Sequence, residues 1–265
     1  MQVVVILAGV VDPKWRLGTL ALRPDHAAVE EAGLPRRLSP FDESALEVAL
    51  RLRDADPTVV VTVALHGGEE SQALLRGVAA FRPNRAFLFG GNSWSFWDPC
   101  SAIGALRSVL AQAEGQADLV LMGREFGDAD DGVLPALLAE RAGLRFCGQA
   151  HSVAMAEGQW VLRRTRGPRE EVLRLPPPAL VSITNERGNR LRHPLMKNVM
   201  LAKRDAVEMV TLTTDEERML ELRAIAPLLA PRRGAADRRM LTGPVEDQAS
   251  ELAAYLRQRG LVEAG

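Results

Sequence analysis

Short apolar runs of strand length recur along this chain and alternate with longer amphipathic segments. Runs buried on both faces occur almost only in parallel sheets that helices cover, so this alternation constrains the fold more than any other feature. It predicts an α/β fold, a parallel sheet with helices on both faces. The predicted strands are Val3–Leu7, Val59–Leu65, Arg85–Phe89, Asp118–Met122 and Ala179–Ile183.

The segments between these runs have helical periodicity. The clearest helix begins after Ser39, a suitable N-cap, with Pro40 at the first helical position and Asp42 in the first turn. Its apolar residues recur at helical spacing as far as Leu52. Four further helices are predicted over Gln72–Phe81, Ala102–Glu114, Val133–Ala142 and Val245–Arg259.

Two regions depart from this alternation. Between Cys147 and Arg174, short alternating segments predict a small antiparallel hairpin or edge pair. Beyond residue 205 the chain turns polar until the last predicted helix. We therefore predict a nucleotide-binding-like α/β domain over residues 1–205 and a C-terminal arm over residues 206–265 that contacts a partner.

Charge and cysteine content exclude several function classes. Lys and Arg total 33 against 34 Asp and Glu, so nothing in the net charge of -1 favours nucleic acid or an anionic membrane. Cys100 and Cys147 lie far apart without further ligands at zinc spacing, which favours a reducing compartment. The apolar start lacks a basic leader, and no run approaches the ~20 apolar residues of a membrane span. We expect a cytoplasmic protein without membrane insertion.

The loop GREFGDADDG follows a predicted strand and precedes a predicted helix, where parallel α/β sheets bind ligands. Asp128, Asp130 and Asp131 could bind a divalent cation, but such a cluster more often stabilises the helix dipole, so we expect no metal. In HGGEES, which begins at His66, the backbone amides could contact phosphate, and a plain strand-to-helix turn is an equal alternative. No histidine has triad-like local spacing, and we expect no catalytic residue.

Aromatic residues gather at Trp94, Phe96 and Trp97 in a chain with 5% aromatics. They either pack under a loop or form an exposed patch against a partner subunit.

Four blocks together resemble the beta subunits of electron transfer flavoproteins and their nitrogen-fixation relatives. The first is SPFDESALEVALRL, in which Ser39 stands where the family has Asn. The others are GGEESQALLRGVAAFRPNRAFLF, DLVLMGREFGDADDGVLPALLAERAGL and PPPALVSITNERGNRLRHPLMKNVMLAK. They match in order and spacing over roughly residues 1–205, which makes the set specific although each block alone is weak.

The resemblance implies a Rossmann-like fold of the adenine-nucleotide-hydrolase type and an electron carrier rather than an enzyme. It implies FAD shared with an alpha subunit in a heterodimer, flavin dehydrogenases as donors and a quinone-reductase-type acceptor. Family members also hold AMP in the beta chain, or a second FAD where they bifurcate electrons. The nucleotide contacts would carry over to Ile6, Ser39, Pro40, Phe41, Asp42, His66, Gly123, Arg124, Glu125, Phe126, Gly127, Asp128, Asp130, Asp131, Gly132, Val133 and Leu134.

The loop departs from the family pattern where it would meet a phosphate. Asp131, Val133 and Pro135 replace the usual Thr, Gln and Gly, and Ala8 and Gly9 replace basic residues after the first strand. An Asp sets a negative charge against a phosphate, and a proline lacks one amide donor. We therefore expect the AMP-type nucleotide of the beta chain to be weakened, altered or absent.

The last block resembles the family's partner-recognition loop. Met196, Val199 and Met200 are flanked by basic residues, a pattern that favours an adaptable apolar contact ringed by charge. The docking residues implied are Arg192, His193, Pro194, Met196, Lys197, Val199, Met200 and Lys203.

Two other readings remain. A degenerate paralogue could pair with an alpha-like chain as a scaffold or nucleotide-binding subunit without redox turnover, which the altered loop favours. An ATP-using adenylating or pyrophosphatase enzyme would need a Ser-Gly-Gly-type loop after the first strand, and ILAGVVDPKW contains none.

Overall fold

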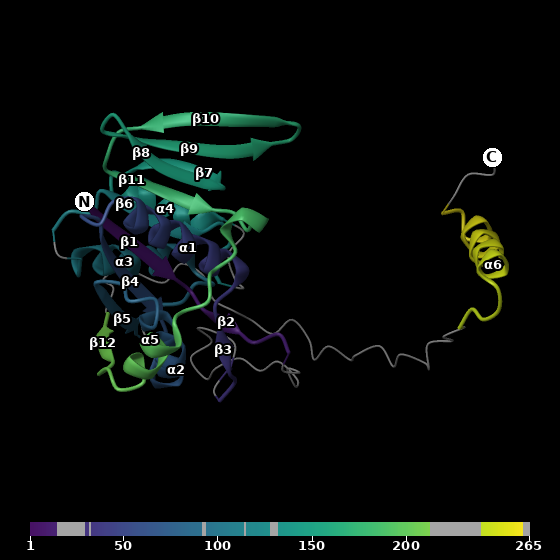
Figure 1. The fold of residues 1–265 in the computed structure, drawn as a ribbon, viewed down its shortest axis with the longest axis horizontal. Coiled ribbons are helices and arrows are strands. Elements are labelled where there is room, and N and C mark those ends of the chain that lie inside the picture. Colours follow the sequence, from purple (N-terminus) through teal and green to yellow (C-terminus); the bar gives the residue numbers. More distant parts are fainter. Residues whose placement is uncertain are drawn as a thin grey trace. The chain divides into compact units, whose positions relative to one another are not determined.

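The computed structural model describes residues 1–14, 30–31, 33–91, 94–113, 115–127, 132–212 and 240–261. Its centre is a seven-stranded sheet in the order β12-β5-β4-β1-β6-β11-β7 (Figure 1). All six neighbouring pairs in this sheet are parallel. The strands are β1 (Gln2–Leu7), β4 (Val60–His66), β5 (Arg85–Gly90), β6 (Leu119–Gly123), β7 (Arg145–Ala150), β11 (Ala179–Ile183) and β12 (Glu208–Thr211). The predicted α/β fold is confirmed.

Helices cover both faces of this sheet because its strands are apolar on both sides. The side chains of Val3, Val5 and Leu7 pack with α1 (Pro40–Ala55) and α2 (Gln72–Ala79). Val4 and Ile6 pack on the other face with α3 (Pro99–Ala111) and α4 (Val133–Arg141), as the two layers in Figure 1 show. Burying one such side chain contributes about 1.5–3 kcal/mol, so helices on both faces stabilise the central strand.

Helix α1 begins as the sequence predicts. Ser39 Oγ accepts a hydrogen bond from the Asp42 amide at 3.0 Å, and the Asp42 carboxylate accepts one from the Ser39 amide at 3.1 Å. This reciprocal capping box satisfies two backbone donors that a helix start would otherwise leave without partners.

Helix α3 begins three residues before the predicted start at Ala102, which corrects that boundary. Asp98 is its N-cap, and its carboxylate accepts hydrogen bonds from the amides of Cys100 and Ser101. Pro99 is at the first helical position, so the helix begins at the cap rather than at the first apolar residue. Glu114, the predicted end, lies outside the described residues.

The segment after Cys147 contains the predicted antiparallel element. β8 (Ser152–Ala156), β9 (Gln159–Arg166) and β10 (Arg169–Leu175) form a three-stranded antiparallel sheet. Cys147 itself lies in β7 of the parallel sheet. Trp160 is fully buried and donates from Nε1 to the Asp118 carbonyl at 3.1 Å, which ties the small sheet to the large one.

Several short elements were not predicted. They are the antiparallel ribbon of β2 (Val10–Val11) and β3 (Arg36–Arg37), the helix α5 (Met196–Ala202), the strand β12 and the turns η1 (Glu69–Ser71) and η2 (Arg187–Asn189). β12 places residues 208–211 in the main sheet, beyond the predicted domain boundary at residue 205.

The chain divides into two compact units, Met1–Arg223 and Ala224–Gly265. The second unit contains the predicted terminal helix, α6 (Val245–Gln258). No helix in the described ranges has the length and apolar character needed to cross a membrane. That the arm contacts a partner stays a prediction.

Candidate functional site

The sheet changes winding direction beside its central strand. From β1 the chain proceeds to β4 and β5 on one side, then crosses to β6 on the other side of β1. Ligands of open parallel sheets bind outside the carboxyl ends of the strands at such a switch point. The residues that follow β1 and β6, Ala8 and Arg124 among them, therefore mark the candidate site.

Asp42 shapes this edge from the first turn of α1. Its carboxylate accepts hydrogen bonds from the amides of Ala8 and Gly9, each at 3.1 Å, in addition to that of Ser39. The side chain is fully buried, and this burial raises the pKa of Asp42 above its ordinary value against the opposing effect of these hydrogen bonds. Asp42 holds the backbone after β1 in place and uses both carboxylate oxygens to do so.

Close packing joins the start of α1 to the end of β6. A Cβ atom at Gly123 would lie 2.8 Å from Cβ of Phe41, so only glycine fits there. The Arg124 guanidinium lies 5.0 Å from the centre of the Phe41 ring and forms an ion pair with Glu125. The predicted residues Phe41, Gly123, Arg124 and Glu125 thus lie together.

A cavity of about 250 Å³ opens beyond the carboxyl ends of β6, β7 and β11. It is lined by Arg124, Glu125, Gly132, Phe146, Gly148, Gln149 and Ser182. Gln149 has a φ of 63°, and its backbone N–H donates a hydrogen bond to Ser182 Oγ at 3.0 Å. The pairing of β7 with β11 shifts register at this point. Gly132 has a φ of 95° and is the N-cap of α4, so the positive end of that helix faces this region.

Histidine 66 ends β4 among aromatic rings. Its ring centre lies 4.5 Å from that of Phe96 and 5.2 Å from that of Trp94. Burial, with the nearby charge of Arg36, lowers the pKa of His66 to about 4, so the ring is neutral at pH 7. Its Nδ1 atom is buried without a hydrogen-bond partner among the described residues, which leaves one polar atom for a ligand to satisfy.

Trp94 belongs to the core between the sheet and helices α3 and α4, and Phe96 packs against it, which fits the packing interpretation for these two residues but not for Trp97. Trp94 is 5% exposed, whereas Trp97 is 41% exposed.

Not all predicted nucleotide residues can present a side chain to a ligand. Ile6, Phe126 and Leu134 are fully buried in the core between the sheet and helices α3 and α4. Only their backbone groups remain for contacts. Asp128, Asp130 and Asp131 lie outside the described residues. Assignment of the whole set to a nucleotide stays a prediction.

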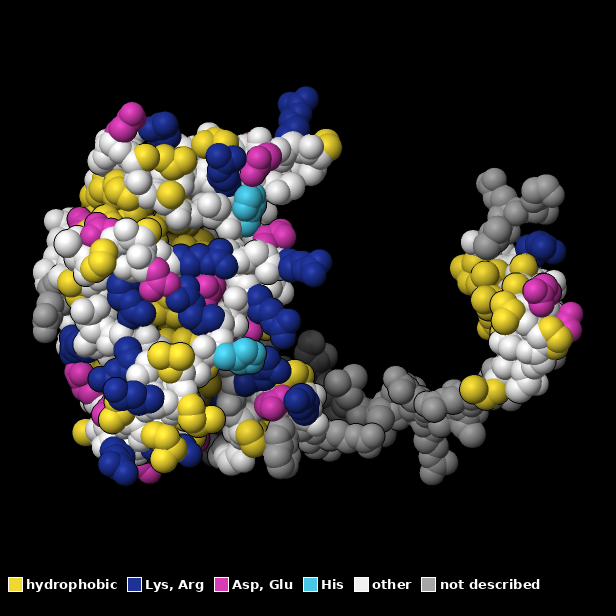
Figure 2. Space-filling view, in the orientation of Figure 1, with side chains coloured by type: hydrophobic (Ala, Val, Ile, Leu, Met, Phe, Trp, Pro, Cys, Tyr) yellow, Lys and Arg dark blue, Asp and Glu magenta, His cyan; other side chains and the backbone are white. Residues whose placement is uncertain are grey.

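The predicted docking segment presents an apolar surface. Met196 is 74% and Met200 52% exposed. Leu195 and Leu201, which were not predicted as docking residues, are exposed beside them. Lys197, Lys203 and Arg204 are exposed on the same segment. Figure 2 shows the corresponding hydrophobic side chains over the region of α5, with Lys and Arg among them.

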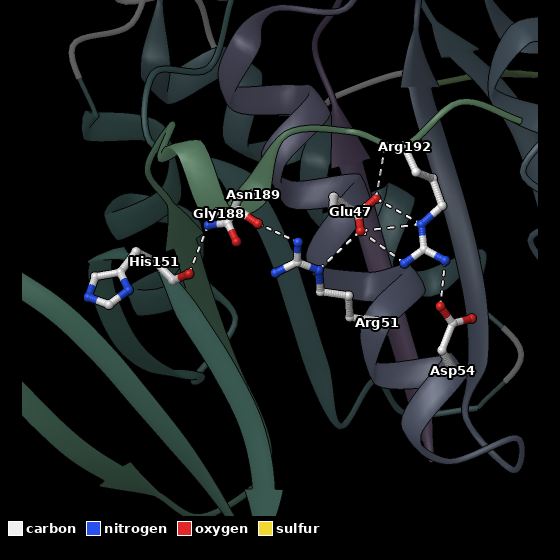
Figure 3. A network of polar contacts seen from close by, with 7 residues as sticks. All are labelled: Glu47, Arg51, Asp54, His151, Gly188, Asn189 and Arg192. Atoms are coloured by element: carbon white, nitrogen blue, oxygen red, sulfur yellow. Dashed lines mark hydrogen bonds and ion pairs between the residues drawn. The ribbon is translucent and has the colours of Figure 1, made fainter.

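Arg192, in contrast, lies against α1, although its side chain is 38% exposed. Its guanidinium contacts Glu47 and Asp54 on α1 (Figure 3). Glu47 was not predicted as a functional residue, although a Glu inside the apolar run Ala45–Leu50 is a signal that could have drawn attention to it. The cavity residues from β7 and β11 carried no comparable sequence signal.

The chain is also similar to known proteins. The family model for the electron transfer flavoprotein domain matches residues 27–215. An electron transfer flavoprotein subunit beta from Mycobacterium leprae is 29% identical over 179 residues, 66% of each chain. One from Megasphaera elsdenii is 27% identical over 186 residues, 68% of each chain. A mitochondrial one from Oryza sativa subsp. indica is 28% identical over 213 residues, 80% of this chain and 82% of that relative. The matches to the first two relatives thus span about two thirds of their length.

Proposed function

Because the chain belongs to the electron transfer flavoprotein family, in its beta-subunit branch, we propose that it pairs with an alpha subunit as a heterodimeric electron carrier. In this role it helps to hold FAD and docks flavin dehydrogenases, with a quinone-reductase-type protein as acceptor. The observation that carries the proposal is that one compact unit combines a cavity at the carboxyl edge of the sheet with an exposed apolar helix. The cytoplasm is the proposed location.

The residues at the carboxyl edge fit a nucleotide cofactor. Arg124 supplies positive charge, part of which its ion pair with Glu125 offsets. Gln149 and Ser182 supply polar groups, and Gly132 begins a helix whose N-terminal end favours an anion. His66 adds a buried, neutral ring nitrogen. A bound flavin would supply the electron transfer itself. The protein would bind and orient it and exclude water.

Pro135 weakens the AMP-type site. It occupies the third position of α4, so the first turn of that helix lacks one of its amide donors. A phosphate at this helix start would receive fewer hydrogen bonds than usual. This observation also supports the second candidate function, a scaffolding subunit without redox turnover.

Nucleotide content tests the cofactor proposal. The chain is co-expressed with its alpha-like partner, the complex is purified and denatured, and released FAD and AMP are quantified by chromatography. One FAD with one AMP per heterodimer is expected of an ordinary carrier, and two FAD would indicate electron bifurcation. One FAD without AMP would show that the beta-chain site has been lost. A complex without flavin would overturn the carrier proposal in favour of the scaffold.

Docking is tested with Met196→Glu. A charge in the centre of the apolar surface should slow electron acceptance from a flavin dehydrogenase while flavin content stays normal. Val172→Glu is the matched control, since Val172 is 54% exposed on β10, away from α5. Normal transfer in the Met196 variant would contradict docking at α5.

A further inference from the structure

Glu47 lies on α1 under the chain segment that contains Arg192, and its side chain is only 4% exposed. Burial by itself would raise the pKa of this carboxyl group. Hydrogen bonds and charge from Arg192, with a further hydrogen bond from Arg51, outweigh burial and hold the pKa of Glu47 below its ordinary value. Glu47 is therefore a buried carboxylate that is charged at neutral pH.

Most of its contacts come from a single residue 145 positions later in the chain. Arg192 donates from Nη2 to Glu47 Oε1 at 2.9 Å, from Nε to Oε2 at 3.0 Å and from its backbone amide to Oε2 at 3.2 Å. Its Nη1 atom binds Asp54, about two turns further along α1. Figure 3 shows the guanidinium fork facing both carboxylates of the helix. A bidentate geometry of this kind fixes orientation as well as distance.

Two further contacts hold the chain just before Arg192. Arg51 donates from Nε to Glu47 at 3.1 Å and from Nη2 to the Gly188 carbonyl. Asn189, which is buried, donates from Nδ2 to the His151 carbonyl at 2.8 Å. Residues 188–192 are thus bound to α1 and to the start of the small sheet.

The helix that follows is short, packs against α2 and leads into β12. Helix α5 has seven residues, its N-cap Leu195 makes no side-chain cap, and Ala202 is its one buried residue. Helices this short are marginal without tertiary anchors. Leu195 and Met196 lie at the start of this helix, so the anchored chain directly before them contributes to their position together with the packing on α2.

We propose that Glu47 is a positioning residue for partner docking: by binding Arg192 it orders the segment that presents the apolar surface of α5. This inference rests on the proposed docking function. An ordered surface loses less conformational entropy when a partner binds, so anchoring should favour association. Glu47 itself touches neither the partner nor the flavin in this role.

The test uses the flavin-loaded heterodimer with Glu47→Gln and Arg192→Lys. Lysine keeps the charge but loses the fork that binds two carboxylates. Arg190→Lys is the matched control, an exposed arginine two residues earlier in the same segment. Three quantities are measured: hydrogen exchange over residues 187–203, flavin content, and electron acceptance as the dehydrogenase concentration is varied.

We expect Glu47→Gln to increase exchange over residues 187–203 and to raise the half-saturating dehydrogenase concentration several-fold. The limiting rate and flavin content should not change. Arg192→Lys should give intermediate values, and Arg190→Lys should behave as the parent protein. A purely structural role of Glu47 would lower flavin content and limiting rate together with docking, which contradicts the inference.

Unchanged exchange or unchanged half-saturation in Glu47→Gln would overturn the inference. If Met196→Glu slows transfer in the same assay, docking at α5 stands and only the anchor fails. If neither variant has an effect, the docking function itself is wrong. Should Glu47→Gln not fold, Asp54→Asn replaces it, because that carboxylate is 49% exposed. Asp54→Asn should shift hydrogen exchange and the half-saturating dehydrogenase concentration in the same direction as expected for Glu47→Gln. If neither quantity shifts, the inference is overturned.

Discussion

The carboxylate of Asp42 accepts a hydrogen bond from the backbone amide of Ala8 at 3.1 Å, across 34 residues of chain. The first strand and the first long helix are therefore joined at the point where the carboxyl edge of the sheet begins. The same carboxylate also accepts hydrogen bonds from the backbone amides of Gly9 and Ser39. One buried group therefore fixes three backbone positions beside the candidate site.

Replacement of Asp42 by Asn should destabilise the fold. An amide has one acceptor oxygen, so its NH2 group would oppose a backbone N–H and leave a buried donor unsatisfied, which costs about 1–3 kcal/mol. Urea unfolding of the two proteins measures the difference. Glu43→Gln in the same helical turn is the control, because its side chain is 33% exposed. Equal unfolding midpoints for the parent and Asp42→Asn would contradict this role.

Stability should depend on pH through His66. Its pKa is about 4 in the folded protein against 6.5 ordinarily, so the unfolded state binds more protons between these values. Stability should therefore fall as pH drops from about 6.5 toward 4, by at most about 3 kcal/mol from this group. His66→Phe should flatten that dependence. NMR titration of the His66 ring checks the cause, and a midpoint near 6.5 would refute it.

The lowered pKa of Glu47 predicts a second effect of pH on stability, at lower pH than the effect of His66. The folded pKa lies below the ordinary value of 4.5, so its stabilising contribution is present above that pH and is lost as pH falls through the folded pKa. Glu47→Gln should remove this acid-sensitive part of the unfolding free energy, measured by urea titration between about pH 5 and pH 3. A parallel pH profile for the parent and the variant would count against a charged, paired Glu47.

Gly123→Ala should separate the start of α1 from the end of β6. The new Cβ atom would lie 2.8 Å from Phe41 Cβ and 3.2 Å from the Phe41 carbonyl carbon, so backbone has to move. Overpacking of this kind costs about 1–3 kcal/mol, and flavin content should fall with the distorted edge. Gly188→Ala is the control, since nothing lies within 4 Å of its added Cβ. Unchanged stability and flavin content in Gly123→Ala would disprove the close approach.

Deletion of residues 244–265 should prevent association with an alpha subunit. Helix α6 has no buried residue, and Val245, Leu252 and Tyr255 are 75%, 47% and 49% exposed. An apolar helix face of this kind is more stable when a partner covers it. Gel filtration of the co-expressed chains measures heterodimer formation, and circular dichroism checks that the main unit remains folded. An intact heterodimer after the deletion would show that α6 is not needed for association.

Local sequence determined the main elements of the fold. Val3–Leu7 is apolar throughout, and Ala179–Ile183 is apolar except for Ser182. Apolar runs of that length are typical of buried strands covered on both faces. Ser39 and Asp42 lie three residues apart, and their capping box forms within one turn, so the start of α1 could be read directly. The start of α3 was missed because the apolar rhythm begins after the true cap at Asp98.

Only the tertiary structure decided how distant polar residues pair. The sequence predicts Arg192 as a docking residue, yet its guanidinium binds Glu47, 145 positions earlier. The cavity combines Arg124 with Gln149 and Ser182, three residues from separate strands and loops. The spacing of apolar residues along the sequence indicates which face of a helix or strand is buried, because burial acts on each residue independently. It does not indicate which charged groups form pairs, because that depends on how separate helices and strands pack.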